Sequence, residues 1–248
     1  MAEMNKYYPT EDTFLNASRG LIKGGEIRNI FGKAPGDDGV VTGGYRAPWE
    51  LASDYVFPPS PLNMTVASAY STPASDDGVK VLIKGLDSDY NEITEVATLN
   101  AATPYVTTQQ FFRINDAVVI LNNPLGNITV KNGSVTYAQI NAGTGKNQAA
   151  IYTVPAGRCF YLYRIDAFAT DSNGGKAAFF RNFVGNNGTG VEFRVAETQF
   201  FENMHIQRRF PFKYDEKQDI KLQLKSSSGS IDGSIFAEGL LLSEPLGG

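Results

Sequence analysis

The stretch Asp219-Ile220-Lys221-Leu222-Gln223-Leu224-Lys225 alternates polar with apolar residues, and the apolar ones fall at every even position from 220 to 224. Successive side chains of a β-strand point to opposite faces of a sheet, so this alternation predicts a strand with one buried and one wet face. The pattern recurs along most of the chain and breaks at Asn, Asp, Gly or Pro. We therefore expect an all-β protein built of antiparallel sheets.

The other alternating segments extend this prediction along the chain. Residues 79–84 and 92–99 are expected to form a hairpin, residues 111–121 a strand, and Asn132-Gly133 the turn of a second hairpin. A short helix is predicted over residues 197–204. Further strands are expected at residues 149–154, 159–169, 177–184, 191–196, 206–212, 219–225 and 234–242. Short strands separated by turn residues are typical of sandwiches and jelly rolls.

Composition divides the 248 residues into an arm and two modules. Five of the twelve prolines fall between Pro35 and Pro61, and proline at that density interrupts both helices and sheet ladders. We expect an irregular, Pro/Gly-rich N-terminal arm over residues 1–62. A first β-sandwich module is expected over residues 63–142, and a second, jelly-roll-like sandwich over residues 149–248.

Four aromatic residues of the arm are the candidate contact residues, namely Tyr45, Trp49, Tyr55 and Phe57. A segment this apolar is not typical of a free linker, so we expect the arm to pack on its own body or on a neighbouring subunit. Buried aromatic anchors are common in protein interfaces, which is our interpretation of these four residues. The alternative is a platform on which they stack against a glycan.

Charge and composition exclude several classes of protein. The net charge of −4 provides no long-range attraction to nucleic acid, and no apolar run approaches the length of about 18 residues that spans a membrane. The lone Cys159 excludes an internal disulfide and a cysteine zinc cluster, and its apolar neighbours predict a buried thiol. No secretory signal is visible in residues 1–10, so we expect synthesis in a cytosol.

Two loops imitate ligand-binding motifs without completing them. The loop Asp87–Glu92 opens like a calcium loop, but Glu92 stands where the sharp bend requires Gly and Thr98 stands where a bidentate carboxylate is required. The segment Gly143–Lys146 resembles part of a phosphate loop, but Ile140 occupies the position of its first Gly. We predict a polar hairpin tip for the first loop, and no bound metal or cofactor for either.

Residues able to carry catalysis are scarce. His205 is the single histidine, and its setting in an alternating segment predicts a surface or hydrogen-bonded side chain. Three adjacent carboxylate pairs are predicted to be solvated turns, namely Asp37-Asp38, Asp76-Asp77 and Asp215-Glu216. We expect no enzymatic activity, and a glycan hydrolase using two distant carboxylates is the third alternative.

Several short segments resemble virion structural proteins of tailed bacteriophages, especially aquatic ones. The matching segments are Gly85–Glu92 with Ala97–Asn100, Phe112–Asn115, Gly126–Val130, Tyr152–Gly157 and Lys217–Ile220. The similarity covers roughly residues 60 to 248 and consists of hairpins and strand caps. It implies a non-enzymatic part of a particle, located on the head, neck or tail and synthesised in the host bacterial cytoplasm.

The resemblance also implies partners. We expect a homo-oligomer, either a trimer or a ring, that contacts other virion proteins through its β modules and its arm. Nucleic acid, membranes and cofactors are not expected partners. The alternative function is a carbohydrate-binding module that recognises a glycan of the host surface.

Overall fold

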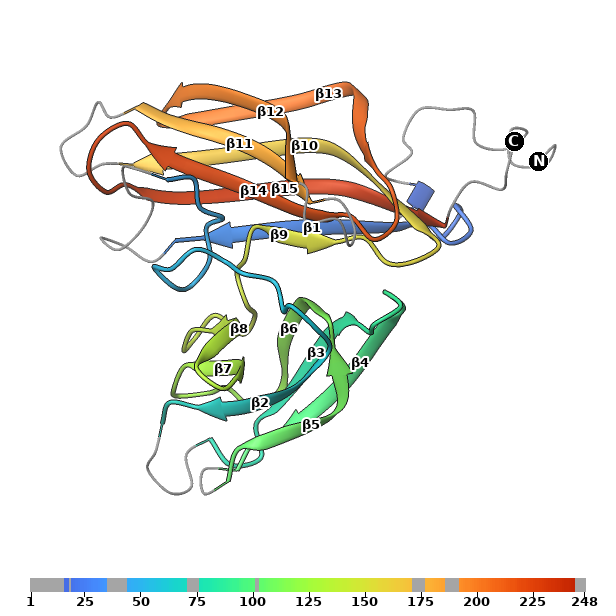
Figure 1. Ribbon diagram of the computed structural model, residues 1–248, viewed down its shortest axis with the longest axis vertical. Coiled ribbons are helices and arrows are strands. Elements are labelled where there is room, and N and C mark those ends of the chain that lie inside the picture. The colour runs from blue at the N-terminus through green and yellow to red at the C-terminus, as the bar shows by residue number, and fades with distance from the viewer. Residues whose placement is uncertain are drawn as a thin grey trace.

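The computed structural model describes residues 16–17, 19–34, 44–70, 76–100, 103–170, 177–185 and 192–243, without the side chains of residues 192, 193 and 209. Every element named within these residues is a β-strand, and all the strand pairs are antiparallel, as the sequence predicts (Figure 1). The strands are β1 (Glu26–Lys33), β2 (Leu62–Ser68), β3 (Lys80–Leu86), β4 (Glu92–Thr98), β5 (Tyr105–Phe111), β6 (Arg113–Leu121), β7 (Ile128–Asn132), β8 (Val135–Ile140), β9 (Ile151–Thr153), β10 (Arg158–Thr170), β11 (Ala177–Gly185), β12 (Glu192–Phe201), β13 (Asn203–Tyr214), β14 (Asp219–Ser226) and β15 (Asp232–Ser243). The part of the chain that the structure describes contains no helix long and apolar enough to cross a membrane.

Strand β1 and strands β9 to β15 form the larger module, which we call the jelly-roll module. Its eight strands follow the order β1-β15-β10-β13-β12-β11-β14-β9. Among the described residues, β12 and β13 pair only through Phe201 and Asn203, so the sheet bends there into two layers of four strands (Figure 1). The layers β1-β15-β10-β13 and β12-β11-β14-β9 have the strand order of an eight-stranded jelly roll.

Apolar side chains from both layers fill the space between them. Phe160 of β10 contacts Tyr152 of β9 and Tyr214 of β13, with ring centroids 5.3 and 6.2 Å apart. The core also contains the three apolar residues of the alternating β14 stretch, and each is completely buried. Cys159 is buried as well, in agreement with the sequence. The apolar positions of the alternation in β14 are therefore the side chains that face this core.

Residues 26–33 depart from the irregular arm predicted for residues 1–62. They form β1, which pairs with β15 over its whole length, from Glu26 opposite Leu241 to Lys33 opposite Ser234. A strand that pairs with a segment about two hundred residues away has no local signal, and basic residues interrupt the apolar ones in this stretch. The jelly-roll module thus begins before the smaller module and is completed after it.

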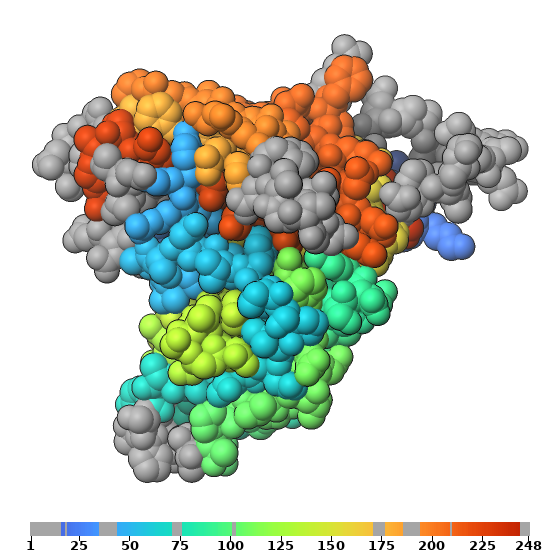
Figure 2. All heavy atoms as spheres, in the orientation of Figure 1, coloured from blue at the N-terminus to red at the C-terminus, as the bar shows by residue number. Residues whose placement is uncertain are grey.

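The smaller module lies between β1 and β9 in the sequence, and we call it the inserted module. Its sheets β4-β3-β6 and β5-β2-β7-β8 enclose a separate core that includes Met64, Ile83, Phe111 and Ile128. In the space-filling view the inserted module projects from the jelly-roll module, and the blue to cyan segment 44–61 lies at the waist between them (Figure 2). Both modules are antiparallel β-sandwiches.

The hairpins of the inserted module follow the sequence prediction in part. The hairpin of residues 79–84 with 92–99 is confirmed as β3 and β4. The strand predicted over residues 111–121 is confirmed as β6, which begins at Arg113, and the preceding strand β5 was not predicted. In the next hairpin Asn132 pairs with Val135, so the central turn residues are Gly133 and Ser134, one position later than predicted.

The helix predicted over residues 197–204 is wrong. Residues up to Phe201 continue β12, and Ala196 to Phe201 pair with β11. The Ala, Glu and Gln residues of this stretch favour helices locally. Because β11 offers an unpaired edge at the same place, the ladder of tertiary hydrogen bonds overrides that local preference.

Gly239 of β15 tests the packing of the jelly-roll core. A Cβ at this position would lie 2.2 Å from the ring of Phe160 and 2.7 Å from the carbonyl oxygen of Tyr161. We predict that Gly239→Ala lowers the free energy of unfolding by about 1 to 3 kcal/mol, because a buried ring and a backbone must both move. Gly44→Ala is the matched control, since nothing lies within 4 Å of the position that its methyl group would occupy. Urea unfolding measures both variants, and equal stabilities would contradict a tight contact at Gly239.

Candidate functional site: the cleft between the modules

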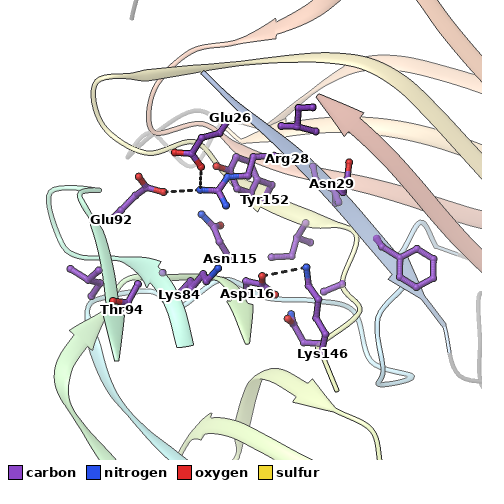
Figure 3. A pocket seen from close by; sticks show the side chains of 18 residues that line it. Glu26, Arg28, Asn29, Lys84, Glu92, Thr94, Asn115, Asp116, Lys146 and Tyr152 are labelled. Atoms are coloured by element: carbon purple, nitrogen blue, oxygen red, sulfur yellow. Dashed lines mark hydrogen bonds and ion pairs between the residues drawn. The ribbon is translucent and has the colours of Figure 1, made fainter. Parts of the chain in front are cut away.

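A cleft of about 590 Å³ separates β1 of the jelly-roll module from the sheet β4-β3-β6 of the inserted module (Figure 3). One wall consists of residues 26–31 of β1, and the opposite wall includes Lys84, Glu92, Thr94 and Asp116. Ala149, Ile151 and Tyr152 complete the lining. The cleft therefore has a mostly polar lining that both modules supply.

Ion pairs join the two walls at one end of the cleft. Arg28 on β1 lies 2.7 Å from Glu26 and 3.3 Å from Glu92, measured from Nη2 to the carboxylate oxygens (Figure 3). Arg158 on β10 lies 3.4 Å from Glu26 and 3.7 Å from Glu92. Glu92 belongs to the inserted module, so these contacts bridge the modules. The Glu26 and Glu92 side chains are almost half exposed, and salt therefore screens the bridge.

A buried ion pair joins the modules at a second place. Arg113, the first residue of β6, donates from Nε and Nη2 to the two carboxylate oxygens of Asp219, each at 2.8 Å. The Arg113 and Asp219 side chains are 9% and 15% exposed. The Nη1 group of Arg113 donates to the carbonyl oxygens of Pro58 and Phe112 at 3.1 and 2.8 Å. Asp219 also accepts a hydrogen bond from the hydroxyl of Thr153 at 2.6 Å.

Further hydrogen bonds reinforce this junction. The Asn115 side chain of β6 donates to the carbonyl oxygen of Thr153 and accepts from its N–H, both at 2.9 Å. The N–H of Ala156 donates to the carbonyl oxygen of Tyr90 at 2.9 Å. The Arg113 guanidinium lies 4.0 Å from the centre of the Phe112 ring and 5.6 Å from that of Tyr90. The two modules are thus tied by a bidentate ion pair, two hydrogen bonds between the Asn115 side chain and the Thr153 backbone, and one backbone–backbone hydrogen bond.

The four aromatic candidates of the arm pack within the chain. Trp49 is 2% exposed and Tyr55 is completely buried, and their rings meet edge to face at 5.1 Å between centroids. The ring of Phe57 also meets Tyr55 edge to face, with centroids 5.2 Å apart. The guanidinium carbon of Arg181 lies 4.0 Å from the centre of the Tyr45 ring. Trp49 and Tyr55 therefore offer no surface to a sugar or to a neighbouring subunit. These two aromatic side chains pack at the junction between the modules. The arm therefore packs on its own chain there, which is one of the two expectations from the sequence.

Glu50 is a buried acid that the sequence does not single out. The residue is 4% exposed, one carboxylate oxygen accepts from the N–H of Gln148, and the other has no partner among the described residues. Burial raises the pKa of the Glu50 carboxyl from its ordinary value to about 8. No pattern distinguishes this Glu in the sequence, because its hydrogen-bond partner Gln148 lies 98 positions further along the chain.

The other titratable candidates have structural partners. His205 lies on the outer face of the sheet, where Nδ1 is 2.5 Å from the carboxylate of Asp166, and its side chain is 54% exposed. This agrees with the predicted surface histidine. Asp76 is buried, not solvated as predicted, and it accepts from the N–H groups of Leu125 and Gly126 at 2.7 and 3.1 Å. Asp37 and Asp38 lie outside the described residues.

The two loops that resemble ligand-binding motifs use their polar groups in hydrogen bonds within the chain. One carboxylate oxygen of Asp87 accepts from the N–H groups of Asp89 and Asn91 at 2.8 and 2.9 Å, so the loop is a self-capped hairpin tip as predicted. In the second loop, the carbonyl oxygen of Gly145 accepts from Val119 of β6 at 2.8 Å. The second loop therefore runs along a strand edge instead of opening a helix. No cluster of three or more metal-ligating residues occurs among the described residues.

Comparison with known proteins gives few matches. No family model matches the chain, and no curated protein matches it. Among solved structures, the chain is similar to one in the structure of infectious bursal disease virus Gx strain, with 11% identity and a TM-score of 0.25 over 90% of this chain and 73% of that one. It is also similar to a chain in T=1 particles derived from infectious bursal virus, with 13% identity and a TM-score of 0.21 over 90% and 70% of the chains. Identities and TM-scores this low establish no relationship.

The buried ion pair predicts a large effect of removing one partner. Arg113→Met leaves the Asp219 carboxylate buried without its cation, so we expect the free energy of unfolding to fall by about 3 to 5 kcal/mol. Lys213→Met is the matched control, because Lys213 and Asp215 form a solvent-exposed pair at 2.7 Å. That change should cost less than about 1 kcal/mol. Chemical denaturation measures both, and a similar small loss in both variants would contradict the importance of the junction.

Glu50 predicts a dependence of stability on pH. Because the folded state binds the proton more tightly than the unfolded state does, stability is greatest below the unfolded pKa and falls as pH rises through about 8. The loss is on the order of a few kcal/mol, at about 1.4 kcal/mol for each pKa unit. Glu50→Gln should remove most of this slope and be the more stable protein above pH 8. Glu202→Gln, at an exposed position, is the control that should retain the slope.

Proposed function

We propose that the chain is a non-enzymatic structural component of a tailed-phage virion that assembles as a symmetric oligomer on the head, neck or tail. One observation carries this proposal. The segments through which the sequence resembles virion proteins are scattered between residues 85 and 220, and four of them meet at the junction between the modules. Arg113 and Asn115 belong to one matching segment, and three others supply Tyr90, Thr153 and Asp219.

The four segments therefore supply the contacts that fix one module relative to the other. A bidentate ion pair with little exposure makes the junction specific in geometry, and the hydrogen bonds of Asn115 with Thr153 add a second attachment. Such a junction suits a part that must hold a projecting module at a constant angle in every copy. A repeated particle position demands this constancy, because symmetry reproduces each angle in all subunits.

The β architecture supports the same role. Two sandwiches with separate cores resist unfolding, and the segment 44–61 fills the waist between them with the buried side chains of Trp49 and Tyr55. Burial of these aromatics gives no support to the glycan platform as the chain's main function. The proposal assigns no residue to catalysis and no cofactor to the chain.

Purified particles of the virus that encodes the chain test the proposal. We expect quantitative mass spectrometry to find the chain in intact particles at a fixed copy number, and imaging to place that number on one symmetry axis of the particle. Particles assembled with Arg113→Met should lose the chain or show weak, blurred density for its projecting module, because the angle between the modules is no longer fixed. Complete absence of the chain from particles that package genomes normally would contradict the role.

A further inference from the structure

Strand β1 has one edge that no other strand covers among the described residues. It is the first strand in the order of its sheet, and it pairs with β15 on one side. The N–H of Ala34 donates to Gly233, and the N–H of Ser243 donates to Gly24, so the even-numbered residues face β15 in this ladder. In an antiparallel ladder, backbone groups alternate between the two edges. The N–H and C=O groups of Ile27, Asn29 and Phe31 therefore point to the free edge.

This free edge opens into the cleft. Six consecutive residues of β1, from Glu26 to Phe31, line it. Neighbouring side chains of a strand lie on opposite faces, so a cavity that touches six residues in a row touches the edge of the strand. Among the described residues, no backbone group outside the ladder with β15 bonds to residues 27, 29 or 31. A volume of about 590 Å³ is within the range of sites that hold drug-sized ligands.

The opposite wall determines the charge that an added strand should carry. Arg28 and Arg158 are neutralised by Glu26 and Glu92, and Lys146 lies 3.3 Å from Asp116. Lys84 also lines the cleft, and within the described ranges no carboxylate pairs with it. The cleft thus presents an unpaired strand edge opposite a lysine, which favours an extended segment that carries acidic side chains.

We propose that this edge receives residues 10–15 of a second copy of the chain as an added β-strand. The segment Thr10-Glu11-Asp12-Thr13-Phe14-Leu15 contains two adjacent acids, so either face of the strand brings one toward Lys84. Thr and Phe favour extended backbone. These residues lie outside the described part of the chain. The proposal rests on the proposed function, because it names the contact through which copies associate. Strand addition to a free edge gives affinity through main-chain hydrogen bonds, and the lysine gives specificity.

Sedimentation analysis of the full chain over a range of concentrations tests this contact. The wild type should associate, and Lys84→Glu should weaken its association at least about tenfold. The double change Glu11→Lys with Asp12→Lys should weaken it similarly, and combining both sets of changes should restore it. Lys80→Glu is the matched control, because Lys80 is on the same strand but does not line the cleft.

A second variant tests the backbone contact itself. Asn29→Pro removes an N–H from the free edge without removing a hydrogen bond to β15, so association should fall while thermal unfolding changes little. Hydrogen exchange at the Ile27 and Asn29 amides should slow on association. A wild type that stays monomeric, a charge swap that restores nothing, or unchanged association in Asn29→Pro would each overturn the contact. None of these outcomes depends on whether particles contain the chain, which tests the proposed function separately.

Discussion

The bidentate pair of Arg113 with Asp219 is the interaction on which the arrangement of the two modules depends. Removing two charges from water costs more than their attraction returns unless their remaining hydrogen-bonding groups are also satisfied. Here they are, because Arg113 donates to two carbonyl oxygens besides the carboxylate, and Asp219 also accepts from Thr153. The pair therefore tolerates one geometry, and a hydrophobic contact of the same area would be less directional.

The position of the inserted module in the sequence explains why such a connection is needed. The chain leaves the jelly roll after β1, builds a complete sandwich, and returns at β9. Two chain crossings alone would permit the modules to rotate about the waist. The segment 44–61 fills the waist with aromatic rings, and Arg113 of the inserted module is held against β14 of the jelly roll. The cleft lies beside this junction, and its walls are connected by ion pairs whose side chains are partly exposed to solvent.

The junction and the cleft thus have different physical characters. Contacts with little exposure fix the angle between the modules, and salt screens them much less than it screens the exposed ion pairs of the cleft. The cleft retains polar groups and a strand edge that can still form hydrogen bonds. The role that we propose would use both characters, since the junction keeps the shape of the subunit while an uncovered strand edge can pair with another chain.

The sequence by itself determined the all-β class and most of the strands, because alternation depends only on which side of a strand faces a core. It also determined that the loops at Asp87 and Gly143 lack complete ligand sets. The membership of β1 in the jelly roll, the burial of Trp49 and Tyr55, and the pairing of Arg113 with Asp219 were decided by the tertiary structure. Each depends on residues about a hundred or more positions apart, and no local pattern of polarity records which distant segments meet.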